Sequence, residues 1–129
     1  ITMSTLGNST GFGSLSSDRI DATGVSNAVR VVFMAGQTVP GGTIVNTMDY
    51  ITISTLGDAA DFGDLPNARQ GNAGANSSTR GLSAGGGPGS NTNIDYVEIM
   101  TTGNALDFGD LNAGAYEAAG CSNGHGGLG

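Results

Sequence analysis

A fifteen-residue phrase occurs three times in this chain, at residues 1–15, 51–65 and 97–111. Each copy begins with alternating apolar residues, continues through a Thr-X-Gly turn and ends in Phe-Gly-X-Leu. Aligned on Gly7, Gly57 and Gly103, the copies are 50 and then 46 residues apart. A period in this range indicates a repeat architecture, in which each unit buries its apolar face only against a neighbouring unit. We therefore expect a stack of similar units.

The composition favours thin, closely packed sheets. The 129 residues include 24 Gly and no Trp, and 37% of them are hydrophobic. Because large side chains are few, the core must consist of Val, Ile, Leu, Met and some Phe, with glycine where backbones approach each other. The length fits one domain. The single cysteine, Cys121, excludes an intrachain disulfide framework.

The charge excludes several classes of partner. Eleven acidic and four basic residues give a net charge of −7, and Lys and Arg form no cluster. Proteins that bind nucleic acid neutralise its phosphates with basic patches, so we expect no nucleic-acid partner. No run of about 18 apolar residues occurs and no signal segment opens the chain, so we expect no membrane insertion.

Alternation of apolar and polar residues predicts the strands of each unit. A β-branched run over 28–36 predicts a buried strand, and its counterpart covers 78–86. Ile51 and Ile53 alternate with Thr52, as in a strand that buries one face. The other expected elements of the two complete units are loops over 37–47 and 87–93, strands over 48–54 and 94–100, turns over 55–58 and 101–104, and last strands over 61–65 and 107–111.

Two finer features follow from the same pattern. Phe and Leu of the last strand lie three residues apart, which predicts a bulge or a twist rather than flat alternation. A weak additional strand is expected within residues 72–78, and no segment has the pattern of an amphipathic helix.

We therefore predict an all-β fold of antiparallel sheet repeats about 46–50 residues long. This single repeat-built region divides into a partial unit over 1–20, full units over 21–69 and 70–115, and a partial unit over 116–129. The C-terminal piece matches the first strand of a unit, and the N-terminal piece matches its last strands. Three arrangements remain open: a fragment of a longer propeller, a closed three-fold symmetric β fold, or a unit completed by a neighbouring subunit through strand addition. We favour the first or the third.

Several residues of each unit resemble the kelch-type β-propeller repeat. These are the paired Gly85-Gly86, the Asp95-Tyr96 pair, Phe108 and Leu111, and in the preceding unit Asp49-Tyr50, Phe62, Leu65 and Arg69. The amino-acid sequence of the repeats is also similar to that of repeats in tail-fibre and appendage proteins of tailed phages, especially those that infect cyanobacteria. The resemblance implies a blade-like scaffold with a role on a virion or another surface, and it implies no catalytic residue.

The candidate ligand-binding residues are Tyr50, Tyr96, Asp49 and Asp95. Each Asp precedes a Tyr at the start of a strand. One interpretation is structural: the carboxylates accept backbone N–H bonds or pair with Arg30 and Arg80. The other is functional: the aspartates line a groove beside loops 37–47 and 87–93, where the tyrosines stack on sugar rings.

The candidate metal-binding residues are Asp58, Asp61 and Asp64, since Ca²⁺ prefers oxygen ligands. A competing interpretation gives these carboxylates a role in turns and at strand edges. Cys121 and His125 form the only Cys/His pair, too few ligands for a metal site in one chain. No cofactor other than Ca²⁺ is suggested.

We expect a non-catalytic structural or host-recognition module of a virion tail fibre or surface appendage, because no polar triad interrupts the repeat. The expected partners are other copies of the chain, other appendage proteins or a host-surface glycan, and the expected location is the virion or an extracellular surface. The alternatives are a subunit of a secreted microbial surface filament assembled by strand complementation, and a small carbohydrate-binding domain.

Overall fold

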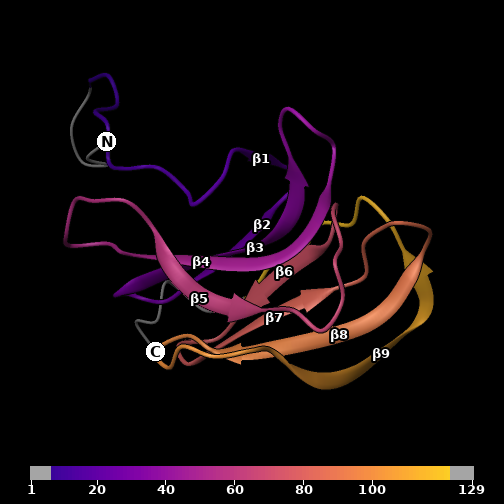
Figure 1. Ribbon diagram of the computed structural model, residues 1–129. Coiled ribbons are helices and arrows are strands. Elements are labelled where there is room, and N and C mark those ends of the chain that lie inside the picture. Colours follow the sequence, from indigo (N-terminus) through magenta and orange to yellow (C-terminus); the bar gives the residue numbers. More distant parts are fainter. Residues whose placement is uncertain (1–6, 123–129) are drawn as a thin grey trace.

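The computed structural model of the protein describes residues 7–122, and those residues contain strands and no helix (Figure 1). The all-β prediction is confirmed. Among the described residues, no helix of the length and apolarity needed to cross a membrane is found. The strands are β1 (Arg19–Ile20), β2 (Thr23–Ser26), β3 (Arg30–Thr38), β4 (Ile44–Thr52), β5 (Ala60–Asp64), β6 (Ala73–Asn76), β7 (Arg80–Ala84), β8 (Asn91–Glu98) and β9 (Leu106–Ala115).

The strands form two antiparallel sheets that repeat the same order. In the first sheet β2 pairs with β3, β3 with β4, and β4 with β5, while the short β1 extends the pairing along β3. In the second sheet β6, β7, β8 and β9 follow in the same way. The additional strand expected within 72–78 is present as β6.

The loop between the second and third strands of the first sheet is shorter than predicted. Residues 44–47 belong to β4, where Ile44 pairs with Gln37 and Val45 with Gly36. β-Branched side chains favour a strand over a loop, so the ladder extends almost to the turn at residues 39–41. In the second sheet, β8 likewise begins at Asn91, inside the predicted loop.

The predicted bulge in the last strand is confirmed in both sheets. Asp49 pairs with Asp61 while its neighbour Met48 pairs with Gly63, so Phe62 is the extra residue on β5. The second sheet has the same shift, which leaves Phe108 as the extra residue on β9. An extra residue bends a strand and turns its side chain. The three-residue spacing between Phe and Leu is therefore a property of this bulge.

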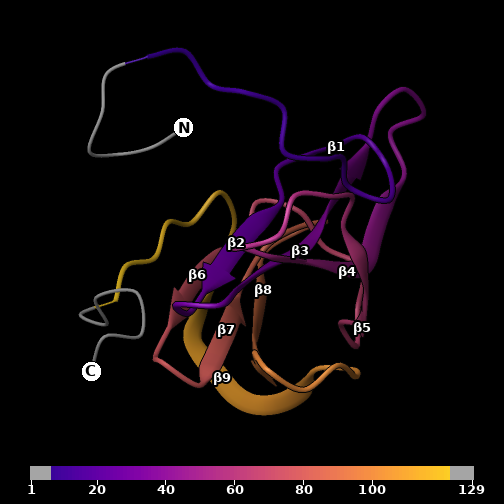
Figure 2. The same ribbon diagram turned by 90° about the vertical axis from the view of Figure 1, so that its left-hand side faces the viewer.

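The two sheets pack against each other, with β2 beside β6 (Figure 2). One core joins them, and both sheets contribute to it: Val25, Val32, Met34, Ala35, Met48, Phe62, Leu65, Val97, Ile99 and Ala105. The approach is close at Gly81, where an added Cβ would lie 2.4 Å from Cγ2 of Val25, and at Gly74, where it would lie 2.4 Å from Oγ1 of Thr23. The glycine-rich composition thus allows the sheets to approach each other closely.

Three hydrogen bonds join the last strand of the first sheet to a turn of the second. The Gly103 and Ala105 N–H groups donate to the carbonyl oxygens of Phe62 and Asp64, at 2.7 and 2.9 Å. In return, the Asp64 N–H donates to Oδ1 of Asn104 at 3.0 Å. A loop and a strand edge therefore satisfy each other across the junction.

The N-terminal segment makes the same three bonds with the first sheet. The Gly57 and Ala59 N–H groups donate to the carbonyls of Phe12 and Ser14, at 2.9 and 2.8 Å, and the Ser14 N–H donates to Oδ1 of Asp58 at 2.9 Å. Residues 12–15 therefore occupy on the first sheet the place that the end of β5 occupies on the second.

The array in residues 7–122 is open: the two sheets do not close into a propeller or into a three-fold ring (Figure 1). Phe62 and Phe108 occupy equivalent positions, yet Phe62 is 2% exposed and Phe108 is 55% exposed. Equivalent side chains therefore have equivalent surroundings only where a neighbouring sheet follows. Beyond the second sheet none of the described residues covers Phe108.

Substitution of Gly81 tests the close packing of the sheets. Gly81→Ala would place a methyl group 2.4 Å from a stiff Val25 side chain, so we expect a loss of about 1–3 kcal/mol in the free energy of unfolding. Gly24→Ala is the matched control, because its Cβ would lie 3.8 Å from the Phe33 ring. Urea denaturation of both variants measures the difference, and equal stabilities would contradict the packing described.

Candidate functional site

Two buried arginines occupy equivalent positions in the repeat. Arg19 lies on β1 and Arg69 lies between β5 and β6, 50 residues later. The side chains of both are fully buried. A buried guanidinium requires a charged partner and further acceptors, so these two positions show where the polar interior of each unit lies.

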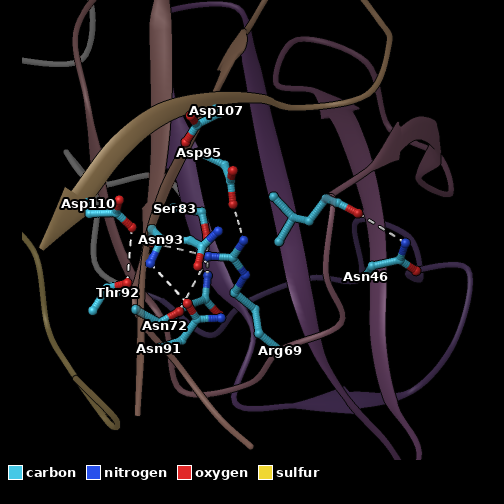
Figure 3. Close-up of polar contacts among 12 residues, drawn as sticks. Asn46, Arg69, Asn72, Ser83, Asn91, Thr92, Asn93, Asp95, Asp107 and Asp110 are labelled. Atoms are coloured by element: carbon cyan, nitrogen blue, oxygen red, sulfur yellow. Dashed lines mark hydrogen bonds and ion pairs between the residues drawn. The ribbon is translucent and has the colours of Figure 1, made fainter. Parts of the chain in front are cut away.

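Each arginine pairs with an aspartate and two backbone carbonyls of its sheet. Figure 3 shows the Arg69 site. Arg69 Nη2 pairs with Oδ2 of Asp95, and its Nη1 donates to the carbonyls of Asn93 and Gly85, both at 3.4 Å. In the first sheet the equivalent partners of Arg19 are Asp49, the Thr47 carbonyl at 2.8 Å and the Ala35 carbonyl at 3.3 Å.

The backbone at Ala35 and Gly85 is adapted to this arrangement. Both residues have positive φ, 62° and 68°, and the pairing of β3 with β4 shifts its register at Ala35. An alanine in this left-handed region is strained by roughly 1–2 kcal/mol. The bond from the buried guanidinium to its carbonyl helps to hold that conformation. The paired glycine noted in the sequence thus marks the arginine site.

The structural interpretation of Asp49 and Asp95 is confirmed in one part, since Asp49 Oδ2 accepts the Ser16 N–H at 3.3 Å. Its other part, pairing with Arg30 and Arg80, is wrong. Successive residues of a strand point to opposite faces. Arg30 pairs across the ladder with Thr52, which shares a face with Tyr50, whereas Asp49 points to the other face. The aspartates therefore meet Arg19 and Arg69, which precede β2 and β6 in the chain. Arg30 and Arg80 meet the tyrosines instead.

Arg30 and Arg80 lie over the rings of Tyr50 and Tyr96, with Cζ 4.4 and 4.9 Å from the ring centroids. Each tyrosine also meets the phenylalanine of the bulge edge-on, at 5.9 Å for Phe62 and 6.1 Å for Phe108. Cation–π and edge-to-face contacts of this kind contribute roughly 0.5–1.5 kcal/mol each. The same cluster of three side chains thus stabilises each sheet.

The two strand arginines differ in their second partner. Arg30 Nη1 donates to the Met100 carbonyl at 3.0 Å and so joins the sheets. Arg80 forms an exposed ion pair with Glu98, with Nε 2.7 Å from Oε1. The hydrogen bond and the charge of Glu98 raise the pKa of Arg80 above its ordinary value.

A shallow groove opens beside each tyrosine, between the third strand and the turn that follows it. Its volume is about 210 Å³ at Tyr50 and about 190 Å³ at Tyr96. Five matched lining positions differ between the two grooves: Ile51 and Val97, Thr52 and Glu98, Leu56 and Thr102, Asp58 and Asn104, and Ala60 and Leu106. The grooves therefore share a position but differ in polarity.

The structure places the four predicted ligand-binding residues in two different environments. Tyr50 and Tyr96 line the grooves. Asp49 and Asp95 are 0% and 1% exposed and pair with arginines, so the grooves do not contain their carboxylates. One ring face of each tyrosine is already covered by a guanidinium, which restricts stacking on a sugar to the remaining surface.

The predicted metal-binding residues have separate contacts. Asp58 accepts the junction bond from Ser14, Asp61 lies exposed on β5, and Asp64 takes part in the other junction through its backbone. In residues 7–122 no three His, Cys, Asp or Glu side chains converge on one point. Cys121 is exposed, and His125 lies outside the described residues.

Sequence reasoning missed the role of Arg19 and assigned Arg69 only to the resemblance. A signal was available, since the two arginines are spaced by the same 50 residues as the phrase itself. The third equivalent position is Ala115, and its carbonyl accepts the Gly86 N–H at 2.8 Å, as the Arg69 carbonyl accepts that of Gly36. Ala115 therefore keeps the backbone hydrogen bond of this position, although it lacks the arginine side chain.

Comparison with known proteins adds no family: no protein-family model matches the sequence, and no curated protein matches it.

Replacement of one partner of the buried pair tests its importance. Asp95→Asn leaves Arg69 with an uncompensated buried charge, so we expect a loss of about 3–5 kcal/mol in the free energy of unfolding. The double variant Arg69→Met with Asp95→Leu should recover much of this loss, because it removes both charges. Guanidinium denaturation measures each variant.

The control for that experiment is the exposed pair. Glu98→Gln removes the partner of Arg80 at the surface, where water solvates both charges, so the midpoint should not change measurably. A loss after Glu98→Gln as large as that after Asp95→Asn would contradict the assignment of the buried pair as the dominant one.

Proposed function

We propose that this chain is a non-catalytic structural and recognition module of a virion appendage such as a tail fibre, built from kelch-like blades. The support is of two kinds. The resemblance of the repeats suggests a virion appendage as the setting, and the polar residues that recur in both units suggest a structural task. Both buried arginines and both buried aspartates pair within the repeat framework, which is the arrangement expected of a scaffold.

The observation that carries the proposal is the repetition of the junction. The three bonds that join Phe62–Asp64 to the turn at Gly103–Ala105 recur between Phe12–Ser14 and Gly57–Ala59. Each unit therefore meets the next through the same contacts in the same direction. Arrays of this kind extend a structure by nearest-neighbour interfaces, as a fibre or an appendage requires.

Recognition would use the parts that vary between units. The buried pairs are constant, whereas the grooves differ at Leu56 and Thr102 and at Asp58 and Asn104. The turns that connect the second and third strands also differ in sequence and length. Variable surfaces on a constant scaffold are typical binding sites, and a host-surface glycan is the partner that we propose.

Location distinguishes the proposed setting from its main alternative. An antibody against this chain would be applied to intact particles and to cells produced from the genome that encodes it. Gold label along a tail appendage is the expected result in electron microscopy. Label on cellular filaments would instead favour the secreted filament subunit, and label confined to the cell interior would contradict both.

The second candidate function, a carbohydrate-binding domain, is favoured by the presence of a groove in each unit. Thr55→Phe and Thr101→Phe would fill the two grooves, since both side chains line them and are exposed. We expect a tenfold or greater loss of affinity, about 1.4 kcal/mol, for any glycan that binds the unaltered chain on an array. Val39→Phe, on an exposed loop, is the control. A blank array would contradict glycan binding.

A further inference from the structure

The second sheet exposes an apolar face at the positions that the first sheet uses for the core. Val32, Met34, Met48 and Phe62 of the first sheet are all at most 2% exposed because the second sheet covers them. Their counterparts in the second sheet, 50 or 46 residues later, are Leu82, Ala84, Ile94 and Phe108. All four are apolar, and none is buried. The composition of this face therefore suits packing against another sheet.

The first sheet carries a matching surface on its opposite side. Phe33 and Ile51 occupy there the positions at which Ser83 and Val97 of the second sheet meet the first. Together with Phe12 and Leu15 they line a cavity of about 190 Å³. At the internal junction, the equivalent space is filled by the core side chains of the first sheet. The cavity is therefore of the kind that Leu82 and Ile94 would fill.

From this match we infer that the exposed face of β6–β9 is a self-association surface, on which a second copy of the chain packs the outer face of its first sheet, head to tail. The inference deepens the proposed function, since it names the surface through which copies would assemble. A second copy is the occupant that we infer, because the outer faces of the two sheets are equivalent to the two faces that pack together inside the chain. Such a heterologous contact leaves one free surface at each end, so it can propagate into a filament or close into a ring.

The N-terminal segment competes with this contact. Residues 12–15 occupy the place on the first sheet that residues 108–111 of another copy would take, and both segments read Phe-Gly-X-Leu. At the inner edge, Gly120 lies so close to Gly74 that an added Cβ would be 2.2 Å from its carbonyl oxygen. Residues near 120 therefore hold the place beside β6 that β2 of the second copy would take. Self-association must displace both of these segments from their places. A substitution that weakens the attachment of either segment should therefore strengthen self-association.

Sedimentation velocity over a concentration series tests the inference on the whole chain. We expect the unaltered protein to form dimers and longer species as its concentration rises, more readily at high salt, because each copy carries a net charge of −7. Phe108→Asp alters the exposed face and Phe33→Asp alters the matching face, so each variant alone should remain monomeric. A protein that stays monomeric at every concentration and salt would overturn the inference.

A mixture of the two variants fixes the orientation. Each variant keeps one intact surface, so head-to-tail packing predicts that Phe108→Asp and Phe33→Asp together form a 1:1 heterodimer that does not grow further. Face-to-face packing of two β6–β9 sheets predicts instead that Phe33→Asp dimerises alone, which would overturn the inference. Circular dichroism confirms that both variants are folded, and Val39→Asp, exposed and outside both surfaces, should associate like the unaltered chain.

A glycine pair tests the competition with the N-terminal segment. An added Cβ at Gly13 would lie 2.0 Å from the Gly57 carbonyl oxygen, whereas one at Gly11 would meet nothing within 4 Å. Gly13→Val should therefore release residues 12–15 and lower the dissociation constant of self-association about tenfold. Gly11→Val should leave this constant unchanged. Weaker association after Gly13→Val would contradict this competition. If the chain does not self-associate but the antibody against it still labels a tail appendage, this inference is overturned and the proposed function is not.

Discussion

The buried Arg–Asp pair is the interaction on which each unit depends. Arg69 lies outside the regular strands, yet its guanidinium reaches Asp95 on β8 and two carbonyls of the sheet. The same arrangement joins Arg19 to Asp49. Because an unpaired charge in this position would be costly, the segment between sheets must occupy one place. The pair thereby sets how each sheet begins.

The first sheet can meet a neighbour on both faces. The Arg19–Asp49 pair lies on the same face as Phe33, which is opposite Asp49 in the ladder, and each charge there is compensated by the other. Val32 and Met34 face the second sheet, whereas Val31 and Phe33 face outward. A sheet in the middle of a stack needs this pattern, because neighbours cover both of its sides. The exposed Phe108 is the same pattern at the end of the array.

Some parts of the two units repeat closely, and others vary. The buried pairs, the arginine-on-tyrosine contacts and the junction bonds recur with little change. The grooves differ in where their carboxylate lies, since Asp58 in one corresponds to Asn104 in the other, and Glu98 corresponds to Thr52. A rigid framework with variable grooves permits changes in recognition without changes in folding. This separation is the physical basis for the functional proposal.

Much of the fold could be predicted from the sequence alone. The period of 50 and 46 residues determined the repeat, and two-residue alternation determined the strands and the absence of helices. The spacing of Phe62 and Leu65 correctly indicated a bulge. These features are local or periodic, and local side-chain geometry is sufficient to produce them. The sequence placed a groove near Tyr50 and Tyr96 but beside loops 37–47 and 87–93, whereas the grooves lie beside the turns at 55–58 and 101–104.

Only the tertiary structure decided which charges meet. Arg30 lies closer in sequence to Asp49 than Arg19 does, but the ladder register turns the two side chains of the first pair to opposite faces. The sequence likewise could not distinguish Phe62 from Phe108, which share their motif and their tyrosine contact. Their exposure differs because burial depends on whether another sheet follows. Periodicity in the sequence determines the strands of each unit, whereas tertiary packing alone determines which side chains each unit contacts and buries.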